Sequence, residues 1–243
     1  MADLYSNTGD GICFAGNQSS WAAARDAGVA ASVSTTSTHI STMVFAGRGP
    51  TRGGGIYYAV NRSFYYFDTS GITGTVSSAT FKIYGSGSAT DGSIIAVKST
   101  AFGGDGGDAL DARDFPQIVG HSAGSSVDGT GDYSANIQSG WNTSGYNDLA
   151  STALLRTDMQ DDDVVIICVM DYTNDYKNVA LTSNATLDLG GYYTDNTGTS
   201  KDPYITYEVA ASGYGNIVNG VAAASIGKVD GVATADIEKV IGV

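Results

Sequence analysis

The chain is poor in several residue types, and each shortage restricts what kind of protein it is. Only 12 of its 243 residues are Lys or Arg, against 25 Asp and Glu, so its formal net charge is −13. Such a charge repels phosphate backbones and anionic membrane surfaces, which disfavours a nucleic-acid-binding function. The chain lacks the run of roughly 18 or more apolar residues that a membrane-spanning helix needs, and residues 1–6 have neither a basic nor an apolar region. We therefore expect neither membrane insertion nor export by an ordinary signal peptide.

Cysteine and histidine are also scarce. The 2 cysteines are Cys13 and Cys168, and Cys168 lies in the apolar run 164–170, where a buried cysteine acts as a small hydrophobic residue. The count permits one disulfide, but a chain without a signal peptide folds where thiols stay reduced, so we expect two free thiols. The 2 histidines, His39 and His121, have no nucleophile motif or metal-ligand spacing around them, so we expect ordinary surface or strand residues.

The abundant residues point to β structure. The chain has 33 glycines, 15 tyrosines and many serines and threonines, whereas charged residues make up 15%, below the roughly 25% of an average soluble domain. With only 3 prolines, this composition predicts an all-β protein with many tight turns rather than a disordered chain. The length fits one large β domain with an appendage, or two small domains.

Hydrophobic patterning locates the expected strands. Residues 78–84 alternate apolar and polar side chains, as a half-buried strand does, whereas residues 56–68 carry aromatic side chains at both parities, as in a strand covered on both faces. We expect further strands at 39–45, 93–98, 164–170, 185–193 and 203–209, and short helical segments at 21–26, 111–115 and 151–159. About eight strands without βαβ alternation predict a jelly-roll β-sandwich over residues 1–210.

Residues 211–243 form a linker followed by a repeat of 11 residues, in which 218–229 is echoed by 229–240. Eleven residues make almost three helical turns, so the apolar positions would share one helix face. Against this, the Asn-Gly and Asp-Gly pairs at 219–220 and 230–231 are strong turn signals. We expect short helical or extended pieces that need neighbours to bury their side chains, either as an assembly element or as a sticky, partly ordered tail. The predicted assembly residues are Val218, Val221, Ile226, Val229, Val232, Ile237 and Val240.

Two stretches carry a family resemblance. Arg62-Ser63-Phe64-Tyr65-Tyr66-Phe67-Asp68-Thr69-Ser70 followed by Val76-Ser77-Ser78-Ala79-Thr80-Phe81-Lys82-Ile83-Tyr84 resembles the signature of DNRLRE-type jelly-roll domains, which are similar in architecture to carbohydrate-binding modules. Residues 96–107, 144–148 and 202–207, with the C-terminal unit, also resemble uncharacterised virion proteins of tailed bacteriophages. This resemblance implies a particle component such as a fibre, spike or decoration protein.

Two kinds of ligand site are compatible with the residue chemistry. The clusters Asp105/Asp108/Asp111 and Asp161/Asp162/Asp163 offer oxygen ligands for a weak Ca²⁺ site, but neither has EF-hand spacing, and solvated turns are the favoured interpretation. We expect no other cofactor. Aromatic side chains at loops and strand ends can stack on the apolar face of a sugar ring, although most tyrosines in such a protein are half-buried strand residues. The candidates for glycan binding are Trp141, Tyr146, Tyr192 and Tyr193.

These observations favour a non-enzymatic structural protein of a virion or another extracellular particle, which associates with itself and with other particle subunits. The alternative is a glycan-binding module for receptor or polysaccharide recognition. A polysaccharide hydrolase would need two carboxylates facing each other across a cleft.

Overall fold

The computed structural model describes residues 1–36, 39–51, 55–89, 92–135, 137–194, 200–210, 228–229 and 232–233. Its strands are β1 Ala2–Tyr5, β2 Gly11–Gln18, β3 Ser32–Ser34, β4 His39–Pro50, β5 Ile56–Asp68, β6 Val76–Ala89, β7 Ser93–Lys98, β8 Gln138–Ser139, β9 Tyr146–Ala150, β10 Val164–Asp171, β11 Ala185–Tyr192, β12 Tyr204–Val209, β13 Lys228–Val229 and β14 Val232–Ala233. Its helical segments are α1 Trp21–Arg25, α2 Ala153–Asp161 and the single turns η1 Phe102–Gly104, η2 Ala112–Asp114 and η3 Tyr172–Tyr176. In the part of the chain so described, no helix is both long and apolar enough to cross a bilayer.

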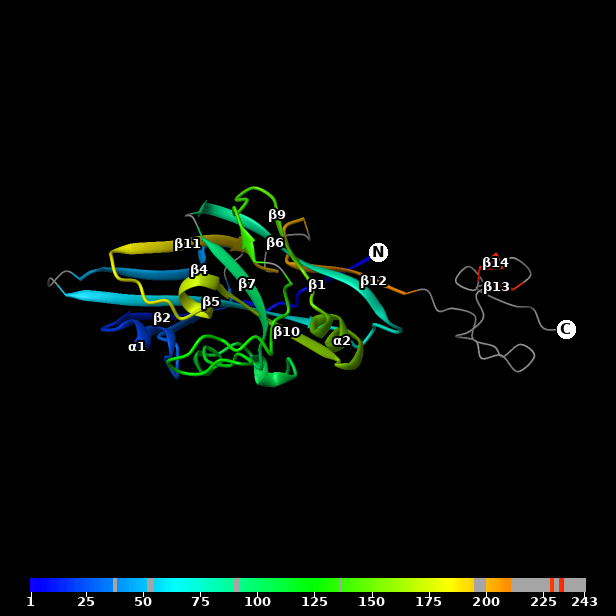
Figure 1. Cartoon of the computed structure of the whole chain (residues 1–243), viewed down its shortest axis with the longest axis horizontal. Coiled ribbons are helices and arrows are strands. Elements are labelled where there is room, and N and C mark those ends of the chain that lie inside the picture. The colour runs from blue at the N-terminus through cyan, green and yellow to red at the C-terminus, as the bar shows by residue number, and fades with distance from the viewer. Residues whose placement is uncertain are drawn as a thin grey trace.

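The body is an antiparallel β-sandwich, which confirms the all-β prediction. One layer contains β1, β12, β6 and β9, and the other contains β2, β5, β10 and β7. The long strand β6 connects the layers, because Thr80–Tyr84 pairs with β9 whereas Gly85 and Ser86 pair with β11. In Figure 1, β4, β5 and β11 run along the long axis of the body, with α1 near one end and α2 near the other.

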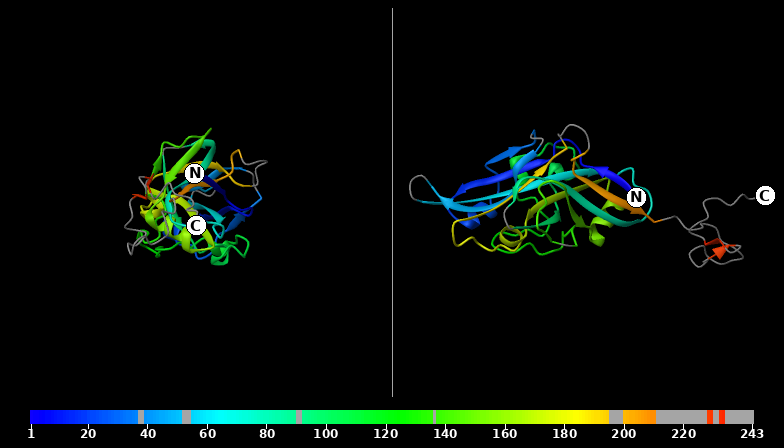
Figure 2. Two further views of the ribbon diagram at one scale, coloured as in Figure 1. Left: turned by 90° about the vertical axis from the view of Figure 1, so that its right-hand side faces the viewer. Right: turned by 90° about the horizontal axis from the view of Figure 1, so that it is seen from above.

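A continuous apolar core fills the space between the layers. Tyr65 and Phe67 of β5 meet Phe81 of β6 edge to face, with ring centroids 5.4 and 5.7 Å apart. All three side chains are fully buried. The right panel of Figure 2 shows the long strands of the body running along its length.

Twelve strands form the body, more than the eight or so expected. Strands β1, β3, β8 and β9 contain only two to five residues each, too few for alternation to be recognised. The eight-residue strand β2 was also missed, because its sequence contains two glycines and an asparagine, which are weak strand formers. Strand β5 has the predicted bounds, and Ser20 caps α1 by accepting a hydrogen bond from the Ala23 amide.

The C-terminal repeat is described only at its centre. Strands β13 and β14 pair antiparallel there, with Val229 opposite Val232. The backbone is therefore extended, rather than helical, at these two predicted assembly residues. Val218, Val221, Ile226, Ile237 and Val240 lie outside the described residues.

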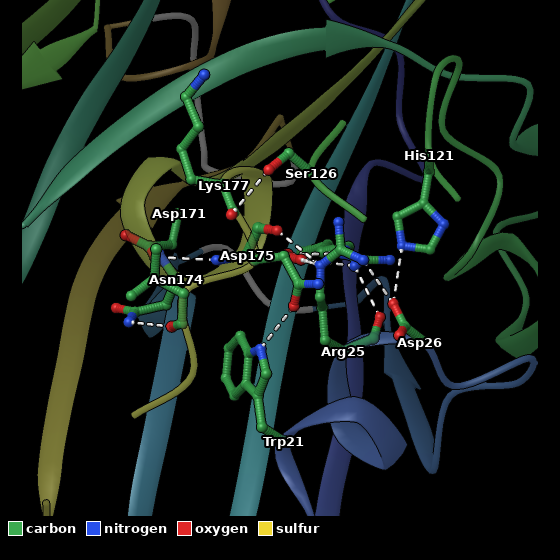
Figure 3. A network of polar contacts seen from close by, with 12 residues as sticks. Trp21, Arg25, Asp26, His121, Ser126, Asp171, Asn174, Asp175 and Lys177 are labelled. Atoms are coloured by element: carbon green, nitrogen blue, oxygen red, sulfur yellow. Dashed lines mark hydrogen bonds and ion pairs between the residues drawn. The ribbon is translucent and has the colours of Figure 1, made fainter. Parts of the chain in front are cut away.

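A buried cluster of charged side chains fastens the loops to the outer face of β5. The Arg62 guanidinium donates to both carboxylate oxygens of Asp175 at 2.7 Å, and to the carbonyls of Phe115 and Arg25 at 2.8 and 2.9 Å. The Arg25 side chain donates through Nε to the Asp175 carbonyl at 2.7 Å and through Nη1 to Asp26 at 2.6 Å. Both arginines and Asp175 are fully buried. Figure 3 shows Arg25, Asp26, Asp175 and His121 converging on this point.

Removing the negative charge at the centre of this cluster should be costly. We expect Asp175→Asn to lower the free energy of unfolding by about 3–5 kcal/mol, because the buried Arg62 guanidinium loses its counter-charge and Arg25 keeps only Asp26. Denaturant unfolding followed by circular dichroism measures this. The matched control is Asp148→Asn, which breaks the more exposed Lys82–Asp148 pair and should cost below about 1 kcal/mol. Equal costs for the two variants would contradict a central role for Asp175.

Two titrating groups beside the cluster act on stability in opposite directions. Burial, with the nearby Arg62 and Arg25 charges, lowers the pKa of His121 from 6.5 to about 4. The unfolded chain therefore binds the extra proton between these values, and His121 makes stability rise with pH from about 4 to 6.5. Burial raises the pKa of Asp171 from 3.8 to about 6. The native state binds that proton, so Asp171 makes stability fall as pH rises through the same range.

The variant His121→Asn should unmask the Asp171 contribution. The natural protein loses the His121 contribution as the pH falls, and the variant does not. The free energy of unfolding of the variant, compared with that of the natural protein, should therefore increase by on the order of 2 kcal/mol when the pH is lowered from 7 to 4.5. Urea titrations at a series of pH values measure the difference, and His39→Asn controls for the other histidine. Parallel pH profiles for the natural protein and His121→Asn would show that His121 does not titrate as described.

Candidate functional site: a row of tyrosines

The outer face of the layer formed by β1, β12, β6 and β9 carries aromatic side chains. Strand pairing places Tyr5 opposite Tyr204, and Tyr84 opposite Tyr146. Because side chains alternate between the faces of a strand, these tyrosines point away from the core while their neighbours Ile83, Leu149 and Ile205 point into it. The pairing register thus gathers residues that are up to 199 positions apart in sequence, from Tyr5 to Tyr204.

The tyrosine row consists of Tyr5, Tyr204, Tyr146, Tyr84 and Tyr192, in that spatial order. Successive ring centroids are 5.5, 5.0, 5.1 and 5.6 Å apart. The last three pairs are nearly perpendicular, with interplanar angles of 81°, 84° and 86°. Edge-to-face packing of this kind stabilises the rings in place and leaves ring faces and edges alternating along the row. The rings are half-buried, and Tyr5 is 37% exposed.

Polar groups fix one end of the tyrosine row. Lys201 Nζ lies 4.4 Å from the Tyr192 ring centroid and 5.3 Å from that of Tyr84, and it donates a hydrogen bond to the Tyr192 hydroxyl at 3.1 Å. This hydrogen bond raises the pKa of Lys201. The Tyr84 hydroxyl donates to the Ser144 carbonyl at 2.7 Å. The rings are therefore held by both packing and hydrogen bonds, and a ligand would meet a surface that is already formed.

Two of the four glycan candidates predicted from sequence, Tyr146 and Tyr192, lie in the tyrosine row. Trp141 lies beside it, because its Nε1 would be 2.9 Å from a Cβ placed on Gly85, the residue after Tyr84. The indole is partly buried and donates to the Gly190 carbonyl at 2.9 Å. The prediction for Tyr193 is wrong. Its side chain is 1% exposed and its hydroxyl bonds to Ser63 inside the core, because it has the opposite parity to Tyr192.

Sequence analysis missed Tyr5, Tyr84 and Tyr204 as members of the site. Tyr84 had a usable signal, since it lies on the polar side of the alternation in residues 78–84. Tyr5 and Tyr204 come together only through the pairing of β1 with β12. Nothing in the local sequence indicates that pairing.

The residues of the two acidic clusters line two hollows of the described structure. Asp105 and Asp161, Asp162 and Asp163 line one cavity of about 550 Å³. Lys98 borders that cavity too, with Nζ 2.8 Å from Asp158 and 3.6 Å from Asp162. Asp108 and Asp111 line a separate hollow of about 600 Å³. Across the described residues, no group of three or more His, Cys, Asp or Glu is placed to hold a metal ion.

The carboxylates of the first cluster instead stabilise local turns. Asp105 accepts a hydrogen bond from the Gly107 amide at 2.9 Å. Asp111 caps η2 by accepting a hydrogen bond from the Arg113 amide, and the Asp114 carboxylate accepts one from the Asp111 amide at 2.9 Å. This agrees with the interpretation of these acidic residues as turn formers.

The two cysteines and His121 have buried side chains. Both cysteines are free and buried, as predicted, and β5 separates them because it pairs with β2 on one edge and β10 on the other. Burial raises the pKa of Cys13 to about 12 and that of Cys168 well above its usual value, which suppresses the nucleophilic thiolate. His121 belongs to the buried charge cluster, and His39 is the first residue of β4.

No protein-family model and no curated protein matches this chain. The resemblance to DNRLRE-type domains and phage virion proteins therefore stays a prediction. The tyrosine row joins five aromatic rings on one face of the molecule.

Proposed function

We propose that this protein is a non-enzymatic structural subunit of an extracellular particle, such as a fibre, spike or decoration subunit of a tailed-phage virion. Residues 1–210 form the displayed body, and residues 211–243 join it to copies of itself or to other particle subunits. The observation that carries the proposal is the pairing of β13 with β14 inside the 11-residue repeat. An isolated two-stranded hairpin is at best marginally stable in water, so the repeat needs a partner surface.

The division into a body and a C-terminal assembly element is supported by the last strand of the body, which is hydrogen-bonded to a neighbouring strand on each side. Strand β12 pairs with β1 on one edge and β6 on the other, and the Ala210 amide still bonds to the Thr75 carbonyl at 2.7 Å. Among the described residues, those that form the core, the charge cluster and the tyrosine row all precede residue 211. The body is thus expected to fold without the repeat.

A chain ending at Gly213 tests the assembly function. It should unfold at the same temperature as the body of the full chain but lose self-association, which light scattering measures. In the full chain, Val229→Asp should produce the same loss because it places a charge among the apolar positions, and Lys228→Ser is the matched control on the neighbouring residue. If the shortened chain keeps the oligomeric state of the full chain, the repeat is not the assembly element.

The tyrosine row favours a second function that is compatible with the first, namely recognition of a glycan by the displayed body. Aromatic rings offer flat apolar surfaces to the C–H face of a pyranose, and a row of them accommodates successive sugars. Lys201 Nζ and the Lys82–Asp148 pair, with its 2.7 Å contact, supply polar groups on the same face. The net charge of −13 favours neutral over acidic glycans.

A glycan array with the purified body tests this function. Tyr84→Ala removes the ring between Tyr146 and Tyr192 and should weaken binding at least about tenfold, on the scale of one lost stacking contact. Tyr84→Phe keeps the ring and should bind within about threefold of the natural protein. Tyr172→Ala, in η3 and outside the tyrosine row, is the matched control. Uniform absence of binding would leave the body as a scaffold only.

A further inference from the structure

A concave surface on β2, β4 and β5 shares no residue with the tyrosine row. Strand pairing places Phe14 of β2 and Phe45 of β4 on either side of Asn61 of β5. These three residues, with Asn17, Tyr57 and Ala59, line a groove of about 300 Å³. We call it the phenylalanine groove. It occupies the first half of β5, on the same face of that strand as Tyr65 and Phe67, which fill the core further along.

Ala59 is the small residue that lines the phenylalanine groove. Ala59 pairs with Gly47 of β4, and Gly16 follows Ala15 on β2. At each glycine a phenylalanine ring occupies the space that a side chain would need. A Cβ on Gly16 would lie 2.0 Å from Phe14 Cζ, and one on Gly47 would lie 2.2 Å from Phe45 Cζ. The two rings therefore lie along the sheet, over the glycines that follow them by two positions. An apolar groove between two aromatic walls results from this arrangement.

A β-bulge places a polar side chain at the groove. The pairing of β2 with β5 shifts register between Ala15 and Gln18. Asn17, at this shift, has φ of 57°, in the left-handed region that residues other than glycine rarely adopt. Bulges of this kind redirect side chains and are concentrated near binding sites. Asn17 is exposed and lines the groove, whereas Asn61 is buried at the pairing position between the two phenylalanines.

We propose that the phenylalanine groove binds one pyranose ring of a neutral glycan. Its volume is at the lower end of the range for ligand pockets, which matches a single ring. Two phenyl walls suit the C–H faces of a sugar, and carboxamide groups donate and accept hydrogen bonds with its hydroxyls. The net charge of −13 disfavours uronate or sulfated sugars. This site shares no residue with the tyrosine row and does not depend on assembly through the repeat.

Nuclear magnetic resonance titration of the full chain tests this proposal, with cellotetraose, mannotetraose and galactotetraose as neutral probes and tetragalacturonate as the acidic probe. At least one neutral probe should shift the side-chain amide signals of Asn17 and Asn61, and the acidic probe should not. Phe45→Ala should weaken that binding at least tenfold, while Phe45→Tyr should retain it within threefold. Tyr84→Ala, in the tyrosine row, should leave it unchanged.

Asn17→Gly separates binding from folding. Glycine adopts the left-handed backbone of residue 17 without strain, so this variant should be at least as stable as the natural protein while its affinity for the neutral probe falls at least fivefold. The proposal is overturned if no neutral probe shifts these signals, or if Tyr84→Ala abolishes binding while Phe45→Ala and Asn17→Gly do not. It is also overturned if only a peptide of residues 218–239 occupies the groove. Oligomeric state, measured separately, reports on the assembly function alone.

Discussion

The buried contact between Arg62 and Asp175 is the interaction on which the arrangement of this protein depends. Neither charge is solvated, so each requires the other, and two further donors of Arg62 bond to the carbonyls of Phe115 and Arg25. One guanidinium thus fixes α1, the loop around η2 and the turn η3 against β5. The Phe115 ring also lies 4.1 Å from the guanidinium carbon. These segments have little regular structure, and the directional hydrogen bonds of Arg62 fix their positions more specifically than hydrophobic contacts alone would.

With the loops held on one face of β5, the other layer remains available as a surface. The layer of β1, β12, β6 and β9 packs its inner side chains on the core and presents the tyrosine row outward. Where the core ends, in the first half of β5, the phenylalanine groove continues on the same face of that strand. The two aromatic surfaces therefore differ in shape, one a row of rings on a sheet and the other a groove lined by two phenylalanines and a tyrosine.

Sequence reasoning predicted most of the fold and part of the site. The strands with strong alternation or long apolar runs, such as β5 and β10, were located closely, because burial alone dictates their pattern. The short strand β1 and the glycine-containing β2 were missed, and with them the pairing that brings Tyr5 to Tyr204 and Phe14 to Asn61. Tyr193 was misassigned because adjacent residues of a strand point to opposite faces, so a shift of one position exchanges the buried and the exposed side. Sites formed across strands depend on register, which local sequence does not encode.

The position of β12 has a mechanical consequence. It is the last strand of the body, yet it is not at an edge, since β1 and β6 flank it. A load applied through the residues after Val209 acts along the strand, whereas the hydrogen bonds to both neighbours run across it. The two ladders would therefore be loaded in shear, with all their bonds sharing the force, rather than opened one bond at a time. A body pulled by its C-terminal end should resist unfolding more strongly than its thermodynamic stability alone would indicate.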